Sequence, residues 1–221
     1  MSVARHTLMG SLWIGAASAV LLWGAAATWL PISELEAFGF ATGALCVWLV
    51  TRENHWNWPI GLANNLFFGV MFWQSRLFAD SGLQVVYFGL GVWGWWNWLR
   101  GGVNHAQLRI SPTTRSEWLC LGLFLIAGTW GLRELLLIVN GSAPFWDALT
   151  TILSLGAQYL LCRKRLEHWW LWIVADVIYV PLYCSRQLPL TALLYAGFIG
   201  LCIAGLRNWR RQLPPRHAPC H

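Results

Sequence analysis

The sequence predicts an all-α integral membrane protein with a seven-helix core and one additional N-terminal transmembrane helix. In the core, two three-helix units of the same orientation flank a connecting helix, a 3+1+3 arrangement. Three observations predict this class: the composition, the long apolar runs and an internal repeat. Of the 221 residues, 57% are hydrophobic, 11% are charged and 18 are Trp, whereas soluble domains carry about 25% charged residues. This composition excludes a disordered chain, a coiled coil, a nucleic-acid-binding module and a conventional soluble enzyme.

Eight apolar runs along the chain are candidate membrane spans. The first follows Arg5 and is about 20 residues long, enough to cross the hydrocarbon core and too long for the apolar part of a secretory signal. Several others are shorter, and tilt or local thinning of the bilayer accommodates such spans. The eight runs are residues 11–30, 36–51, 57–75, 82–99, 118–138, 145–162, 168–185 and 189–206.

The basic residues fall mainly on one side of this eight-helix topology. Cytoplasmic loops carry an excess of Lys and Arg, so the sequence predicts cytoplasmic N- and C-termini in an inner or plasma membrane. Because the basic residues lie between apolar runs, the net charge of +6 needs no nucleic-acid partner. Twelve of the 15 lie on the predicted cytoplasmic side, and the other three are Arg76, Arg133 and Arg186.

An internal repeat relates the two halves of the chain. The matches at a shift of 113 include Arg52 with Arg165 and His55-Trp56 with His168-Trp169. The matches at a shift of 111 include Gln84 with Tyr195 and Asn97-Trp98 with Asn208-Trp209. Transporters built from such repeats hold their substrate between the units, near the middle of the membrane. The predicted divisions are an N-terminal segment with the additional helix (1–34), a first unit (35–103), a loop and connecting helix (104–142), a second unit (143–211) and a cytoplasmic tail (212–221).

Two carboxylates lie within the predicted spans, where ionisable groups are costly and usually face a cavity or a partner. Asp147 stands at the outer end of the fifth core span and Asp176 midway along the sixth. Asp176 shares one helical face with Trp172, Tyr179 and Tyr183. An acid among aromatic rings suits a planar polar or cationic ligand. The alternative is that polar groups of a neighbouring helix satisfy each carboxylate.

Amide and aromatic side chains on other spans are candidates for the same site. Amides in the middle of the membrane can present hydrogen-bonding groups to a ligand, or can join neighbouring helices. The repeat predicts that Gln84 and Tyr195 face each other across the axis between the units. The candidate substrate-binding residues are Asn64, Asn65, Phe68, Gln84, Tyr87, Asp147, Thr151, Gln158, Trp172, Asp176, Tyr179 and Tyr195.

Most of the tryptophan is expected at the membrane interface, where its amphipathic ring is favoured. Trp95, Trp98, Trp169 and Trp209 stand near the ends of predicted spans and belong to this group. Trp172, in contrast, lies on the face that carries Asp176.

Motifs for catalysis and metal binding are missing from the sequence. It contains no HExxH, GxSxG or P-loop pattern, and its six cysteines form no CxxC pair. All six His lie in predicted loops, in tails or at a helix end, and a membrane haem protein would need axial His within its spans. We therefore expect no enzymatic activity, no metal and no cofactor.

Several segments resemble the PnuC family of transporters, over roughly residues 40–212. In the first half these are Asn57–Asn64, Leu77–Gln84 and Trp93–Trp98. In the second half they are Asp147–Ser154, Arg163–Trp169, Trp172–Asp176 and Leu190–Tyr195.

The resemblance implies uptake of nicotinamide riboside by facilitated diffusion, with trapping by intracellular phosphorylation. It also implies a core like that of SWEET sugar transporters, and a homotrimer surrounded by lipid in the bacterial inner membrane. The cationic ring and the ribose of this substrate suit Asp176 with its aromatic face and amides such as Asn65, Gln84 and Gln158. Relatives in the family carry thiamine or riboflavin, so another vitamin is an alternative substrate. A Trp-rich membrane scaffold that transports nothing is the alternative from another functional class.

Overall fold

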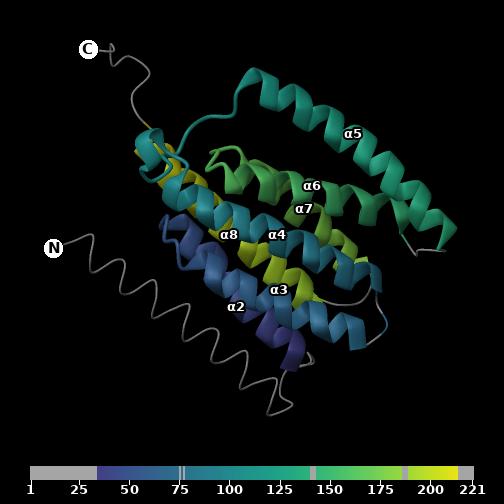
Figure 1. Cartoon of the computed structure of the whole chain (residues 1–221). Coiled ribbons are helices and arrows are strands. Elements are labelled where there is room, and N and C mark those ends of the chain that lie inside the picture. Colours follow the sequence, from purple (N-terminus) through teal and green to yellow (C-terminus); the bar gives the residue numbers. More distant parts are fainter. Residues whose placement is uncertain (1–33, 75, 77, 140–142, 186–188, 214–221) are drawn as a thin grey trace.

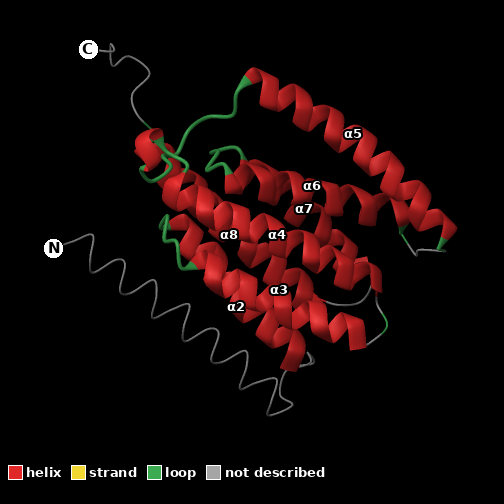
Figure 2. Ribbon diagram, viewed as in Figure 1, coloured by secondary structure: helices red, strands yellow, loops and turns green. Residues whose placement is uncertain are grey.

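The computed structural model describes residues 34–74, 76, 78–139, 143–185 and 189–213. The described residues form helices joined by loops and turns, and no β-strand (Figure 2). The additional helix expected at 11–30 and most of the C-terminal tail lie outside the described residues. The helices are α2 (Glu34–Thr51), α3 (Asn57–Gln74), α4 (Phe78–Arg100), α5 (Arg115–Ile138), α6 (Pro144–Cys162), α7 (His168–Ser185) and α8 (Pro189–Gln212), with a short 3-10 helix, η1 (Val103–His105).

These α-helices correspond to the seven spans expected for the core. Their ends agree with the apolar runs to within a few residues, and the largest differences are extensions by polar residues at the start of α4 and the end of α8. At the start of α4, the Ser81 hydroxyl donates to the carbonyl of Gly69 at 2.9 Å, which holds the added turn against α3. Two helices, Arg115–Ile138 and Thr191–Gln212, are long and apolar enough to cross a membrane by length and composition.

Helix α5 lies at the edge of the bundle and packs against α6 (Figure 1). It begins with a capping box, in which the Glu117 amide donates to the Thr114 hydroxyl and the Thr114 amide donates to the Glu117 carboxylate. Large apolar side chains are exposed along its length, including Leu119 at 76% and Leu123 at 70%. An apolar face of this extent is typical of a helix that contacts lipid or a partner.

The order of contacts among the helices is the same in the two halves of the chain. In the first half α2 packs on α3 and α3 on α4, and in the second half α6 packs on α7 and α7 on α8. The halves meet where α2 packs on α8 and α4 packs on α6. Figure 1 shows α2, α3, α4, α6, α7 and α8 gathered into one bundle, with α5 outside it.

Matching hydrogen bonds join the two halves at one end of this bundle. Trp98 Nε1 donates to the Leu161 carbonyl at 2.9 Å, and Trp209 Nε1 donates to the Val50 carbonyl at 2.9 Å. Each indole gives a second donor to a carbonyl at the end of a helix in the other half, since Val50 and Leu161 also accept from the amides of Glu53 and Lys164. The preceding asparagines bond to the next carbonyls: Asn97 to Cys162 (2.8 Å) and Asn208 to Thr51 (2.6 Å).

In these bonds, each donor and each acceptor of the first half lies 111 residues before its counterpart in the second half. The first residues of α3 and α7 are also 111 residues apart. The shift of 113 expected for the start of the repeat is therefore wrong. The turns between the first two helices of each half have equal lengths, 52–56 and 163–167, so no two-residue change is needed. In the structure His168 is equivalent to Asn57, and Trp169 to Trp58.

Four buried tryptophans form the core at this end. Trp58 meets Trp98 edge to face with ring centroids 5.4 Å apart, and Trp169 meets Trp209 in the same way at 5.7 Å. Trp98 and Trp209 join the two pairs at 5.9 Å. None of the four is more than 3% exposed. The expectation that Trp98, Trp169 and Trp209 anchor the protein in the membrane interface is wrong, because close helix contacts enclose them.

An ion pair links the turns that follow α2 and α6. Glu53 and Lys164 stand at equivalent positions, both with positive φ (53° and 54°), and Lys164 Nζ lies 2.7 Å from Glu53 Oε2. The ammonium also donates to the Leu108 carbonyl at 3.0 Å and lies 4.7 Å from the ring centroid of Trp98. The two turns are thus tied directly to each other.

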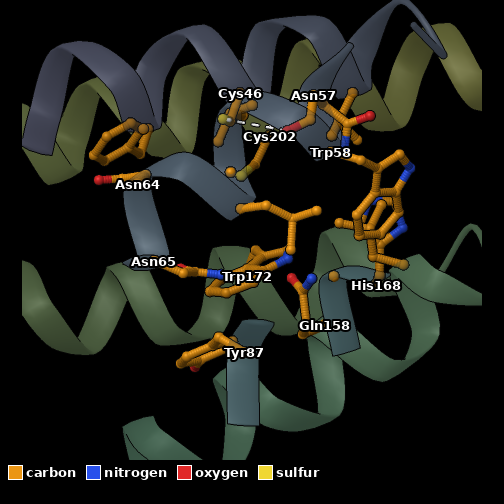
Figure 3. A pocket seen from close by; sticks show the side chains of 18 of the residues that line it. Cys46, Asn57, Trp58, Asn64, Asn65, Tyr87, Gln158, His168, Trp172 and Cys202 are labelled. Carbon is orange, nitrogen blue, oxygen red and sulfur yellow. Dashed lines mark hydrogen bonds between the residues drawn. The ribbon is translucent and has the colours of Figure 1, made fainter. Parts of the chain in front are cut away.

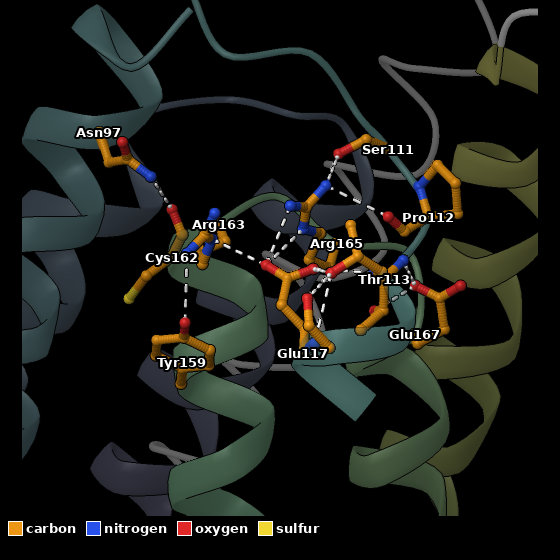
Figure 4. A network of polar contacts seen from close by, with 12 residues as sticks. Asn97, Ser111, Pro112, Thr113, Glu117, Tyr159, Cys162, Arg163, Arg165 and Glu167 are labelled. Atoms are coloured by element: carbon orange, nitrogen blue, oxygen red, sulfur yellow. Dashed lines mark hydrogen bonds and ion pairs between the residues drawn. The ribbon is translucent and has the colours of Figure 1, made fainter. Parts of the chain in front are cut away.

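A second polar network fixes the start of α5 to the turn between α6 and α7 (Figure 4). Arg165 Nη2 lies 2.9 Å from Glu117 Oε1, and Arg163 Nε lies 3.1 Å from the same oxygen. Glu167 accepts from the amide and hydroxyl of Thr113 at 2.8 and 2.6 Å. These contacts hold the segment before α5 against the bundle.

Candidate functional site

A cavity of about 390 Å³ lies between the two halves of the bundle (Figure 3). Both halves contribute to its wall, through α2, α3 and α4 on one side and α6, α7 and α8 on the other. In the view of Figure 3, Trp172 occupies the middle, with Asn64 and Asn65 toward one side and Trp58 and His168 toward the other.

Nine of the twelve candidate residues line this cavity: Asn64, Asn65, Phe68, Gln84, Tyr87, Gln158, Trp172, Asp176 and Tyr195. The other three, Asp147, Thr151 and Tyr179, are not among its lining residues. Asp147 belongs to the first turn of α6. The Tyr179 ring packs against Tyr195, with centroids 4.9 Å apart. The structure therefore brings together the candidates of α3, α4 and α8, with Trp172 and Asp176 of α7 and Gln158 of α6.

Asp176 provides the charge of the cavity. It is 6% exposed, and the Cys202 thiol donates to its Oδ2 at a sulfur–oxygen distance of 3.9 Å. Among the described lining residues it is the one carboxylate, and none of them is Lys or Arg. A carboxylate enclosed in a wall without Lys or Arg is stabilised in its ionised form when a cation binds beside it.

Equivalent residues of the two halves line the cavity. Gln84 and Tyr195, which the repeat pairs, both line the cavity. Further pairs at the spacing of 111 residues are Asn57 with His168, Trp58 with Trp169, Asn65 with Asp176, and Tyr87 with Phe198. The position equivalent to Trp172 is Gly61, so the indole has no bulky counterpart on α3. The cavity thus follows the repeat in outline, while its carboxylate comes from α7.

A family model for nicotinamide mononucleotide transporters matches residues 33–211. The chain belongs to this family. A nicotinamide riboside transporter, PnuC, of Escherichia coli (strain K12) is 30% identical over 80% of this chain and 85% of its own. The riboflavin/roseoflavin transporter RibM of Streptomyces davaonensis is 25% identical over 79% of this chain and 83% of its own. A crystal structure of the vitamin B3 transporter PnuC is 24% identical, with a TM-score of 0.66 over 90% of this chain and 91% of that one.

Membership of the nicotinamide mononucleotide transporter family confirms the resemblance seen in the sequence, and the structural likeness confirms an all-helical fold of this type. Relatives named as transporters support a role in membrane transport rather than catalysis. The described residues contain no group of three or more His, Cys, Asp or Glu side chains placed to hold a metal ion.

Sequence reasoning missed several residues that this family member places in the cavity wall. His168 was expected only at a helix end and Trp169 in the membrane interface, yet both line the cavity, as does Trp58. His168 is fully buried, and its Nδ1 lies 2.6 Å from the Arg165 carbonyl. The signal was present in the repeat: at a spacing of 111, His168 falls on Asn57, which the sequence places on the same helical face as Asn64 and Phe68.

Proposed function

We propose that this chain carries nicotinamide riboside across the bacterial inner membrane by facilitated diffusion. The observation that carries the proposal is the cavity between the two halves, in which Asp176 and Trp172 of α7 line one wall and none of the described lining residues is Lys or Arg. The names of several relatives, which are nicotinamide riboside transporters, support the same substrate.

The chemistry of the substrate matches this wall. Its pyridinium ring is planar and carries one positive charge, so it can stack on the face of Trp172 while the Asp176 carboxylate balances its charge. The carboxamide of the ring both donates and accepts hydrogen bonds, as do the amides of Asn65, Gln84 and Gln158. We propose these five residues as the principal contacts, with the remaining candidates shaping the cavity or its approaches.

Charge separates the nucleoside from its nucleotide. A phosphate monoester brings nearly two negative charges at neutral pH, and the described wall offers it no Lys or Arg and one opposing carboxylate, Asp176. We therefore propose the riboside and not the mononucleotide as the substrate. The same argument explains trapping: once phosphorylated inside the cell, the product no longer suits the cavity and cannot leave by it.

The proposed architecture is the 3+1+3 core of the SWEET type, with α2–α4 and α6–α8 as the units, α5 as the connector and an additional helix before them. Contacts of α2 with α8 and of α4 with α6 support this division. We propose that the units are related by an axis along the membrane normal and move against each other to expose the cavity to one side at a time. The sorting of basic residues supports cytoplasmic termini, and the exposed apolar face of α5 supports contact with lipid or with the other subunits of a homotrimer.

Calorimetry on the purified protein in detergent tests the substrate. We expect binding of nicotinamide riboside, weaker or no binding of the mononucleotide, and loss of riboside affinity in Trp172→Ala. Asp176→Asn keeps the shape of the side chain and removes its charge, so riboside affinity should fall about 10- to 100-fold, the equivalent of losing a charged hydrogen bond. Asp80→Asn is the matched control, because Asp80 is exposed in the first turn of α4 and lies outside the cavity wall.

Three results would contradict the proposal. Unchanged riboside affinity in both Asp176→Asn and Trp172→Ala would refute the site. Preference for thiamine or riboflavin over the riboside would assign another vitamin. A protein that binds none of these compounds would be a scaffold.

A further inference from the structure

Five buried polar atoms of the cavity wall have no hydrogen-bond partner among the described residues, and one of them, Asn64 Oδ1, lies further along α3. The other four are Asn57 Oδ1, Trp58 Nε1, His168 Nε2 and Trp169 Nε1. These residues are between 0 and 5% exposed. They form two equivalent pairs, because Asn57 and Trp58 begin α3 as His168 and Trp169 begin α7. These four groups therefore gather at one end of the cavity, where both helices start.

Neighbouring side chains of the same type are satisfied. The indoles of Trp98 and Trp209 contact Trp58 and Trp169, and each donates to a carbonyl at 2.9 Å. Buried polar groups in folded proteins nearly always have a partner, and each one left without a partner costs free energy. Trp98 Nε1 and Trp209 Nε1 are thus paired, whereas Trp58 Nε1 and Trp169 Nε1 in the wall are not; outside the wall, Trp95 Nε1 also lacks a partner. In the wall, a molecule in the cavity can complete the unpaired groups.

The four groups comprise two acceptors and two donors. His168 Nδ1 donates to the Arg165 carbonyl at 2.6 Å, since a carbonyl only accepts. In the neutral ring this leaves Nε2 as an acceptor. Asn57 Oδ1 is the other acceptor, and the two indole N–H groups can only donate.

We propose that these groups form a hydroxyl-binding subsite that takes the vicinal diol of a pentose. A hydroxyl donates one hydrogen bond and accepts others, so two adjacent hydroxyls can satisfy two acceptors and two donors together. A carboxylate or phosphate would be opposed by the two acceptors, and an ammonium by the two indole N–H groups. Because the pentose is the ribose of the riboside, this inference rests on the proposed function.

The geometry of α7 places the two parts of the substrate. His168, Trp172 and Asp176 follow one another at intervals of four residues, which puts them on one helical face and about 6 Å apart along the axis. A glycosidic bond joins the pyridinium ring directly to the ribose, so a ring against Trp172 brings the sugar about one turn along α7. With Asp176 beyond the ring, the sugar falls at His168.

Calorimetry with three probes tests the subsite: nicotinamide riboside, its 2′,3′-dideoxy analogue, and 1-methylnicotinamide, which keeps the cationic ring and lacks the sugar. We expect the wild-type protein to bind the riboside at least tenfold more tightly than either other probe. His168→Phe keeps an aromatic ring and removes the acceptor, so it should reduce riboside affinity about tenfold and leave 1-methylnicotinamide unchanged. His168→Gln retains an acceptor and should recover part of the loss. His55→Phe, at an exposed position, is the control for the same change elsewhere.

The outcomes separate the two proposals. If the wild-type protein binds the riboside and its dideoxy analogue with equal affinity, the subsite is overturned and the transport proposal stands. The same conclusion follows if a folded His168→Phe protein loses equal affinity for all three probes. The wild-type comparison needs no variant, so it decides the matter even if His168→Phe does not fold. A wild-type protein that binds none of the three probes contradicts the proposed substrate and the subsite together.

Discussion

Replacement of Gly205 by alanine tests the close approach of α8 to Trp169. A Cβ at this position would overlap Cζ2 and Cη2 of the indole and lie 2.8 Å from Cε2. The ring cannot turn away freely, because Trp169 is 1% exposed and packs edge to face on Trp209 at 5.7 Å. Gly205→Ala must therefore displace the indole or separate α8 from α7, and the cavity that Trp169 lines changes shape with it.

The magnitude follows from two opposing terms. Overpacking of a close-packed core costs about 1–3 kcal/mol, while alanine in a helix is about 0.5–1 kcal/mol more favourable than glycine. Gly200→Ala is the matched control on the same helix, because its Cβ would have no neighbour within 4 Å. The difference between the two variants isolates the overpacking term, so we expect about 1–3 kcal/mol between them.

Thermal unfolding in detergent measures this difference. For a chain of this length, each kcal/mol corresponds to about 2–4 °C in unfolding temperature. Gly205→Ala should melt below the wild-type protein and bind the riboside more weakly, whereas Gly200→Ala should melt at or slightly above it. The equivalent change, Gly94→Ala, directs its Cβ into the Trp58 indole and should behave like Gly205→Ala. Equal unfolding temperatures for Gly205→Ala and Gly200→Ala would refute this account of the packing.

Three further perturbations test the contacts that join the halves and start α5. Trp209→Phe removes one of the two donors to the Val50 carbonyl and should cost about 0.5–1.5 kcal/mol of unfolding free energy. A loss below 0.3 kcal/mol in denaturant unfolding would show that the bond is unimportant. Lys164→Met should lower the unfolding free energy by about 1.5–3 kcal/mol, and Glu53→Gln should lower it less because glutamine keeps an acceptor. A lower unfolding temperature for Glu53→Gln than for Lys164→Met would contradict the ion pair as the tie between the turns. Thr114→Ala removes the N-cap of α5 and should cost about 1 kcal/mol, with Thr114→Asn near wild type in the same melts.

The helices and most of the proposed site were predictable because they depend on local composition and on spacing. Apolar runs give the ends of helices within a few residues, and a helical period puts Trp172 and Asp176 on one face. Three candidates, Asp147, Thr151 and Tyr179, fell outside the cavity wall. Whether such a residue lines the cavity depends on how far along its helix the wall extends. The spacing of residues on a single helix does not determine that distance.

The repeat illustrates a similar limit. Identities such as Arg52 with Arg165 favoured a shift of 113 in the first part of each unit, but hydrogen bonds and ring contacts require 111 throughout. Isolated identities in a Trp-rich chain arise by chance, whereas a matched set of contacts has to satisfy geometry in both halves at once.

By itself the sequence determined the helical membrane class, the seven core helices, the existence of a repeat and one charged, aromatic face, because each of these follows from which residues are apolar and how they are spaced. The tertiary structure alone decided that Trp98, Trp169 and Trp209 are enclosed instead of lying at the membrane interface, and that His168 belongs to a cavity. A tryptophan near a helix end suits a lipid interface and a buried contact equally well by composition. Only the approach of another helix, permitted here by Gly94 and Gly205, determines which of the two environments it occupies.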